Sequence, residues 1–350
     1  MVDPKPVDYW DFFARECGRL NAPLYARLAE SVRGDEEIKT LASGARKGQP
    51  PSNVLLGAVH YLLLRGEADH ALKAHYLNLN GGARADGDPF PLFQDFCRAY
   101  RAALEPLIAT RVTNTNEVGR SAFLFAGFRA LSNEAGEPLA LVEIGPSAGL
   151  NLLWDRYGYR FIAGGTAHEA GKAGAAFVIA MPLRGLYVPP LGHPPEIASR
   201  VGLERNPVDL TCQEERDWLK ALVWPDHIDR LARLEGALGV YDPEAAEIRA
   251  GDALELLPDA LRAAPEDQTL CVYHTMAVYQ FSARMKASLD DILTVAGLRR
   301  PVYRLSVEWD GERYPLKLAR YWDGAKEERI LAFCDPQGAW LEWLDKAIPA

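Results

Sequence analysis

The stretch from Leu139 to Trp154 carries the strongest chemical signal in this chain. An apolar run over residues 139–144 carries Glu143 near its end, and small residues follow it in a turn: Gly145, Ser147 and Gly149. The pattern predicts a buried strand, a tight turn and then a helix over residues 149–157. Glycine lets a backbone approach a ligand closely, and the first N–H groups of a helix attract anions. The stretch therefore predicts a site for a nucleotide-like cofactor or an anion.

Three kinds of site use a strand, a glycine-rich turn and a helix, and the spacing separates them. A dinucleotide-binding turn needs its third glycine where this chain has Leu150, so that interpretation fails. A nucleophile elbow needs G-x-S-x-G, which residues 145–149 match, and Ser147 would then be the nucleophile of a serine hydrolase. The third pattern, E-x-G-x-[GS]-x-G, begins at Glu143 and resembles the first motif of class I methyltransferases, which bind S-adenosylmethionine. A turn that merely packs tightly is the remaining interpretation.

The elements around this turn predict an α/β fold with a separate helical part. Residues 7 to about 133 show apolar side chains at helical spacing, which predicts an all-helical N-terminal domain over residues 1–133. Residues 134–350 instead alternate strand-like and helical runs, which predicts a doubly wound, mostly parallel sheet. Its expected parallel strands are 139–144, 197–203, 246–250 and 269–274. Segments 316–322 and 329–333, joined by Asp323-Gly324, predict a C-terminal antiparallel hairpin.

The order of the strands favours the methyltransferase pattern over the hydrolase. A hydrolase elbow follows several earlier strands, whereas everything before Leu139 reads as helical. Ser147, Asp252 and His274 can still be ordered as a hydrolase triad, but so many carboxylates make such an order easy to find. In the methyltransferase pattern the glycine-rich strand comes first, as it does here, and an antiparallel strand closes the sheet.

Acidic and protic residues follow the later strands in the order that this pattern requires. Glu204 ends the second strand, where a carboxylate accepts from both ribose hydroxyls. Asp252 and Ala253 follow the third strand, and Asp252 could accept from the adenine amine. Tyr273 and His274 end the fourth strand, where reacting groups are expected, and His274 could take a proton from the methyl acceptor.

Each of these residues has a plainer interpretation beside the functional one. Glu204 could be a solvated residue before a helix, Asp252 an N-cap and His274 a hydrogen-bonded structural histidine. Glu143 and Glu204 are also 61 positions apart, whereas the acid of a nucleotide-binding unit usually follows its turn by about 20 residues. The excess predicts an insertion at about residues 158–197, which could be a lid or a substrate platform.

The whole chain, from about residue 9 to 345, resembles an uncharacterised bacterial family recorded only as a domain of unknown function. The similarity lies in the segments 115–120, 143–151, 204–209, 251–258 and 272–274. The resemblance implies a methyltransferase-like core with a helical N-terminal part, and it implies no known substrate. The cofactor-binding residues expected with it are Glu143, Gly145, Ser147, Gly149, Asn151, Glu204, Asp252 and Ala253.

A second group of polar residues lies shortly before the first strand. Asn116 could cap a helix over residues 117–130, and Glu117 and Arg120 could pair on one face of it. Alternatively the three residues lie at the mouth of the cofactor pocket, and Arg120 makes a bidentate contact with a carboxylate of the cofactor or the substrate.

Composition limits the partners that this protein can have. A net charge of −9 supplies no basic excess for nucleic acid or a membrane surface. Five scattered cysteines without a C-x-x-C pair indicate reduced thiols and no metal site, as in a cytoplasmic protein. We expect an S-adenosylmethionine-dependent methyltransferase with a small-molecule acceptor. The alternatives are a serine hydrolase using Ser147 and His274, or a non-catalytic protein that binds a nucleotide-like ligand.

Overall fold

A computed structural model describes residues 9–83 and 85–349, which fall into two compact units. The helical unit comprises the residues up to Thr115 together with Asp209–Ala232. The sheet unit comprises Asn116–Val208 and the chain from Arg233 onward. These bounds differ from the predicted division at residues 133 and 134. The long helix before the first strand packs with the sheet, and the chain returns to the helical unit after the second parallel strand.

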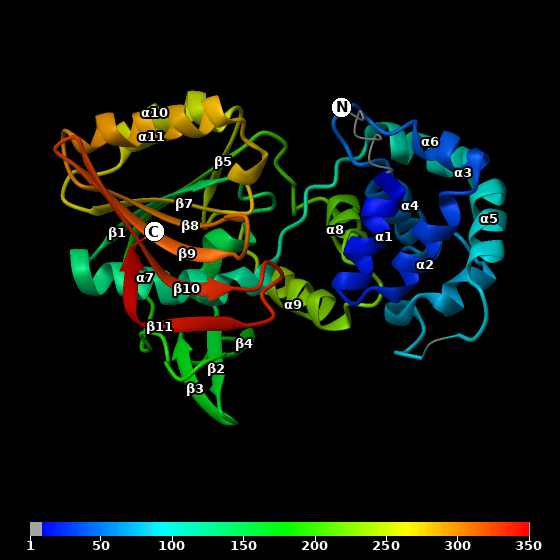
Figure 1. Cartoon of the computed structure of the whole chain (residues 1–350), viewed down its shortest axis with the longest axis horizontal. Helices are drawn as coiled ribbons and strands as arrows, with labels where there is room; N and C mark the ends of the chain where they lie inside the picture. The colour runs from blue at the N-terminus through cyan, green and yellow to red at the C-terminus, as the bar shows by residue number, and fades with distance from the viewer. Residues whose placement is uncertain (1–8, 84, 350) are drawn as a thin grey trace, which may run out of the picture. The chain divides into compact units, whose positions relative to one another are not determined.

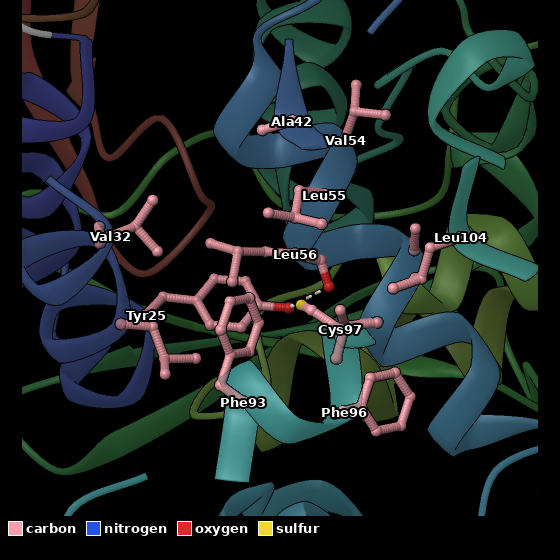
Figure 2. Packing of buried hydrophobic residues seen from close by; sticks show 14 of the residues in the cluster. Tyr25, Val32, Ala42, Val54, Leu55, Leu56, Phe93, Phe96, Cys97 and Leu104 are labelled. Carbon is pink, nitrogen blue, oxygen red and sulfur yellow. Dashed lines mark hydrogen bonds between the residues drawn. The ribbon is translucent and has the colours of Figure 1, made fainter. Parts of the chain in front are cut away.

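The helical unit is built around a helix that is apolar on all sides. Its helices are α1 (Tyr9–Arg19), α2 (Pro23–Val32), α3 (Glu36–Ala42), α4 (Pro51–Leu64), α5 (Phe90–Ala99), α6 (Arg101–Thr110) and α8 (Gln213–Ala221), with short 3-10 segments at Ala71–His75 and Leu77–Leu79. A helix without a polar face must be buried, and α4 lies at the centre of this unit's core. Figure 2 shows Tyr25 and Phe93 in that core, where the Tyr25 hydroxyl donates to the Leu56 carbonyl at 3.2 Å.

The sheet unit contains an eight-stranded mixed sheet with the order β11-β10-β9-β8-β7-β1-β5-β6. The strands are β1 (Leu139–Ile144), β5 (Ile197–Glu204), β6 (Glu247–Ala250), β7 (Thr269–Thr275), β8 (Val302–Val307), β9 (Pro315–Trp322), β10 (Ala325–Cys334) and β11 (Leu341–Pro349). The strands β6, β5, β1, β7 and β8 pair in parallel, and β8 to β11 pair antiparallel. The predicted mostly parallel sheet is therefore present.

The antiparallel end of the sheet is longer than the predicted hairpin. Asp323 and Gly324 do form the turn between β9 and β10, with φ values of 47° and 74°, as a two-residue hairpin loop requires. The strand β11 was not predicted, because Asp345 and Lys346 interrupt its apolar pattern. It joins the sheet as the partner of β10.

Helices cover both faces of the sheet (Figure 1). The helices α10 (Ala253–Ala263) and α11 (Ala283–Gly297) share a core with one face. The helix α7 (Ser121–Ala135) packs on the other, so closely that a Cβ atom at Gly127 would lie 2.8 Å from the Leu305 side chain. The residues of α9 (Ile228–Gly239) belong partly to one unit and partly to the other. Across the described ranges, no helix is both long and apolar enough to span a membrane.

The predicted insertion forms a second sheet rather than an unstructured loop. The strands β2 (Gly158–Ala163), β3 (Thr166–Gly171) and β4 (Val178–Pro182) pair in the order β3-β2-β4. The rings of Tyr159 and Phe125 stack with their centroids 4.6 Å apart, and Phe125 belongs to α7. Because this contact is fully buried, the insertion is part of the hydrophobic core of the sheet unit.

Candidate functional site

The parallel strands place their carboxyl ends along one edge of the sheet. From β1 the chain continues to β5 and β6 on one side, and β7 and β8 lie on the other. Such a reversal of strand order opens a crevice beyond the carboxyl ends, where ligands bind in open α/β sheets. The residues that sequence reasoning selected after each strand therefore lie at one edge: Glu143, Gly145, Ser147, Gly149, Glu204, Asp252, Tyr273 and His274.

The glycine-rich turn is left-handed at its three small residues. The φ values of Gly145, Ser147 and Gly149 are positive, at 72°, 57° and 78°. Residues other than glycine rarely adopt such values. However, a Cβ atom at Gly145 would lie 2.7 Å from the Ala277 Cβ, and one at Gly149 would lie 2.8 Å from the Ile248 Cδ1. The glycines thus permit close packing against protein side chains. A larger residue at 149 would damage the fold, so a substitution there does not test ligand binding.

The prediction of an ordinary helix over residues 149–157 is wrong. Leu150–Arg156 is a 3-10 helix, and Leu153 departs from helical dihedrals with φ −100° and ψ 16°. Its first N–H group is already bonded, because Leu150 donates to the Asn116 Oδ1 at 3.0 Å. Because this segment is short and its first N–H group is occupied, it provides no anion site at a helix N-terminus, contrary to the sequence prediction.

Asn116 and Asn151 connect this segment to the chain that precedes α7. Asn116 does not cap a helix over residues 117–130, since Val118–Arg120 is a 3-10 turn and α7 begins at Ser121. The Asn151 Nδ2 donates to the Glu117 carbonyl at 3.3 Å, and the Asn151 Oδ1 accepts from the Ser121 hydroxyl at 2.8 Å. The Glu117 carboxylate lies 3.7 Å from the Arg233 guanidinium. These buried contacts hold the strand-to-helix junction in place.

Glu204, at the end of the neighbouring strand β5, accepts a hydrogen bond from the glycine-rich turn. Its Oε2 accepts from the Ser147 N–H at 2.8 Å and its Oε1 from the Asn206 N–H at 3.0 Å, and the residue is 7% exposed. An ionised carboxylate has about four acceptor positions, so these two bonds leave capacity for further donors. The plainer interpretation of a solvated glutamate is therefore wrong.

Asp252 performs the role of an N-cap, which was its plainer interpretation. Its Oδ1 accepts from the Leu254 N–H at 2.9 Å, and its Oδ2 pairs with Arg205 at 2.6 Å. Ala253 is the first residue of α10 and is half-buried. Because both oxygens of Asp252 already have partners, an adenine amine would bind here by competing with the exposed Arg205 side chain.

Glu143 is a buried carboxyl group at the end of β1. The Tyr273 hydroxyl donates to its Oε2 at 3.0 Å. Burial raises the pKa of Glu143 to about 8, assisted by the charge of Glu204 and opposed by the Tyr273 hydrogen bond and by Arg120. Tyr273 itself is fully buried, with its ring edge-on to Phe128. In this arrangement the Tyr273 hydroxyl positions the Glu143 carboxyl group, and that hydroxyl is itself enclosed in the core.

Arg120 lies near these carboxyl groups but is bound to main-chain oxygens. Its Nε donates to the Pro336 carbonyl at 2.8 Å and its Nη1 to the Thr275 carbonyl at 3.0 Å. The guanidinium therefore ties the end of β7 to the loop before β11. A bidentate contact with a ligand carboxylate, as the sequence suggested, would have to use the N–H groups that these two bonds leave over.

His274, near the end of β7, pairs with a residue that the sequence did not identify as its partner. Its Nδ1 lies 2.7 Å from the Glu308 Oε1, while its Nε2 is buried and has no hydrogen-bond partner within the described ranges. Glu308 also accepts the N–H groups of Ala277, Val278 and Tyr279, each at 3.0 Å. Glu308 follows the apolar strand β8 just as Glu204 completes β5, so a carboxylate at the end of an apolar run was the signal that could have found it.

The donor set at this edge is made of carboxylates, main-chain N–H groups and one imidazole. Among the residues that the structure describes, no three His, Cys, Asp or Glu side chains are grouped so that they could hold a metal ion. The arrangement can accept hydrogen bonds from a hydroxylated ligand through Glu204 and a proton through the His274 Nε2.

Comparison with known proteins places the chain in one bacterial family. A family model described as an uncharacterised protein conserved in bacteria (DUF2332) matches residues 8–343. A search of curated proteins found no match.

Proposed function

The chain belongs to the uncharacterised bacterial family DUF2332, and we propose that it is an S-adenosylmethionine-dependent methyltransferase acting on a small molecule. The observation that carries the proposal is the meeting of the Glu143–Gly149 turn, Glu204 and His274 at the point where the strand order reverses. The order of these motifs along the chain is the order found in class I methyltransferases. Their convergence on one edge supports a shared ligand site.

Glu204 and the turn are the groups that fit the cofactor. The carboxylate of Glu204 is buried beside the Ser147 N–H and retains acceptor capacity, which suits a pair of ribose hydroxyls. Asp252 lies after the next strand and would accept from the adenine amine. Bound S-adenosylmethionine supplies a methyl group that its positive sulfur already activates. The protein then has to position the acceptor, exclude water and receive a proton.

His274 is the residue suited to receive that proton. Because its Nδ1–H donates to the Glu308 carboxylate, the neutral ring carries its lone pair on Nε2. The Nε2 atom is buried and is the unpartnered one, so it would accept a proton from the hydroxyl or amine of an acceptor that reaches it. Glu308 is a positioning residue in this proposal, since it sets the tautomer and the orientation of the ring.

Asp252→Asn should weaken S-adenosylmethionine binding by roughly tenfold or more, the usual effect of losing a hydrogen bond to a charged group. Asparagine keeps the N-cap, so the fold is preserved. Arg205→Gln is the matched control, because it breaks the same ion pair and leaves the carboxylate in place. Calorimetry with S-adenosylmethionine, S-adenosylhomocysteine and NAD measures both variants. No binding of the first two ligands to the wild type would reject the cofactor, and equal loss in both variants would reject the role of Asp252.

A serine hydrolase is the second candidate, because Ser147 has the positive φ of a nucleophile elbow. The elbow of an α/β-hydrolase follows several earlier strands, whereas β1 is the first strand of the described chain. We therefore expect that fluorophosphonate probes leave the protein unlabelled and that Ser147→Ala retains affinity for S-adenosylmethionine. Mass spectrometry of the probe-treated protein checks this. Stoichiometric labelling of Ser147 would favour the hydrolase instead.

A further inference from the structure

A cavity of about 500 Å³ opens on the sheet unit between α10 and α11. Its floor includes Leu270 and Val302, at the starts of β7 and β8. The site proposed above lies at the opposite ends of the same strands, where His274 is four residues further along β7. At about 3.3 Å per residue, the two sites are separated by roughly 13 Å along the strand. The cavity is therefore distinct from the candidate methyltransferase site.

The inner wall of the cavity is apolar. Leu261, Leu270 and Val302 are buried members of the core between the sheet and its two helices. Ile292 and Ala296 of α11 are half-buried and continue this wall, and Val295 at the entrance is 65% exposed. The volume lies within the range of small-molecule sites, about 300–1,000 Å³. Such a wall favours the hydrocarbon part of a ligand.

The rim of the cavity carries charged side chains of both signs. Two arginines are neutralised locally, since Arg262 pairs with Asp259 and Arg299 pairs with Glu266 at 3.0 Å. Arg300 is different, because its guanidinium donates to the carbonyls of Ala264 and Pro265. Within the described ranges it makes no ion pair with a carboxylate. It therefore retains N–H donors at the cavity wall, and the acidic residues that act on its charge are Glu266 and Asp267.

Two acidic residues line the cavity and oppose the charge of Arg300. Asp291 of α11 and Glu266 are both exposed, so water and salt screen their fields. Arg300 is half-buried, and burial lowers the pKa of its guanidinium. A charge in a less solvated position interacts more strongly with a nearby partner. The geometry therefore favours an anionic group on the ligand.

We propose that this cavity binds a small amphipathic acid, with its hydrocarbon part against Leu261, Leu270 and Val302 and its carboxylate on Arg300. Medium-chain fatty acids have this chemistry. The proposal does not depend on methyltransferase activity, because the two sites use different residues.

Calorimetric titration of the full-length protein with decanoate, decanol and decyltrimethylammonium tests the proposal. Decanoate should bind, and Arg300→Gln should weaken its binding about tenfold while leaving decanol unchanged. Arg299→Gln is the matched control, since the neighbouring arginine is already paired with Glu266, and it should change little. Ala296→Phe, which fills the cavity from α11, should abolish binding of both decanoate and decanol.

Four results would overturn the proposal. Absence of saturable decanoate binding at millimolar concentration would exclude the ligand class. Equal losses of decanoate affinity in Arg299→Gln and Arg300→Gln would exclude a specific contact between the carboxylate and Arg300. Tighter binding of decyltrimethylammonium than of decanoate would show that Asp291 governs the site. If Arg300→Gln proves unfolded by circular dichroism, undiminished binding in folded Ala296→Phe would still reject the cavity.

Discussion

Glu308→Ala is expected to lower the free energy of unfolding by about 3–5 kcal/mol at neutral pH, as is typical when one member of a buried charged network is removed. Glu308 accepts hydrogen bonds from three main-chain N–H groups and from the His274 ring. Alanine would leave all of these donors without their acceptor, and a buried unsatisfied donor costs about 1–3 kcal/mol. Urea denaturation at pH 7 measures the change, with exposed Glu312→Ala as the control.

The effect of Glu308→Ala should also depend on pH. Burial acts to raise the pKa of Glu308, but the His274 contact and the N–H groups of Val278 and Ala277 outweigh it and hold the pKa below its usual value. A lowered folded-state pKa means that the ionised carboxylate stabilises the protein above its unfolded-state pKa of about 4.3, and that this contribution is lost as the pH falls through the folded-state pKa. The difference between wild type and variant should therefore shrink in acid. A decrease of less than about 1 kcal/mol in the free energy of unfolding of Glu308→Ala at pH 7 would contradict the stabilising role of Glu308.

Glu143→Gln is expected to stabilise the protein at alkaline pH. The pKa of Glu143 is raised from 4.5 to about 8, chiefly by burial, so the folded state keeps the proton that the unfolded chain loses. As the pH rises from 4.5 to 8, this group removes stability on the order of 3–4 kcal/mol. Glutamine has nearly the same shape and no charge to bury, so it avoids this loss.

Chemical denaturation of both proteins between pH 5 and pH 9 checks the Glu143 prediction. Wild type and Glu143→Gln should be similar at the acid end, and the variant should be more stable by on the order of 3 kcal/mol at the alkaline end. Exposed Glu327→Gln serves as the control and should follow the wild type throughout. Parallel curves for wild type and Glu143→Gln would show that Glu143 titrates normally.

The sequence by itself determined the first four parallel strands of the sheet, one of its hairpins and the tightness of its central turn. Runs such as 139–144 and 269–274 became strands because continuous apolar segments suit the buried interior of a parallel sheet. Asp323-Gly324 became a hairpin turn because these residues tolerate positive φ. Residues Gly145 and Gly149 predicted a tight turn, and glycine tolerates the positive φ values that both adopt there. These properties depend on local sterics and on burial periodicity, which the chain displays residue by residue.

Tertiary structure alone decided which residues meet across the site. Leu150–Arg156 looked like an ordinary helix, but its first N–H group is bonded to Asn116, and it winds as a 3-10 segment. Glu308 meets His274 because β7 and β8 lie side by side, and no spacing within the sequence encodes that adjacency. Gly145 and Gly149 suggested space for a ligand, yet Ala277 and Ile248 arrive from later segments and fill it. A contact between distant segments depends on the strand order and on loop closure, and both are properties of the whole chain rather than of any local pattern.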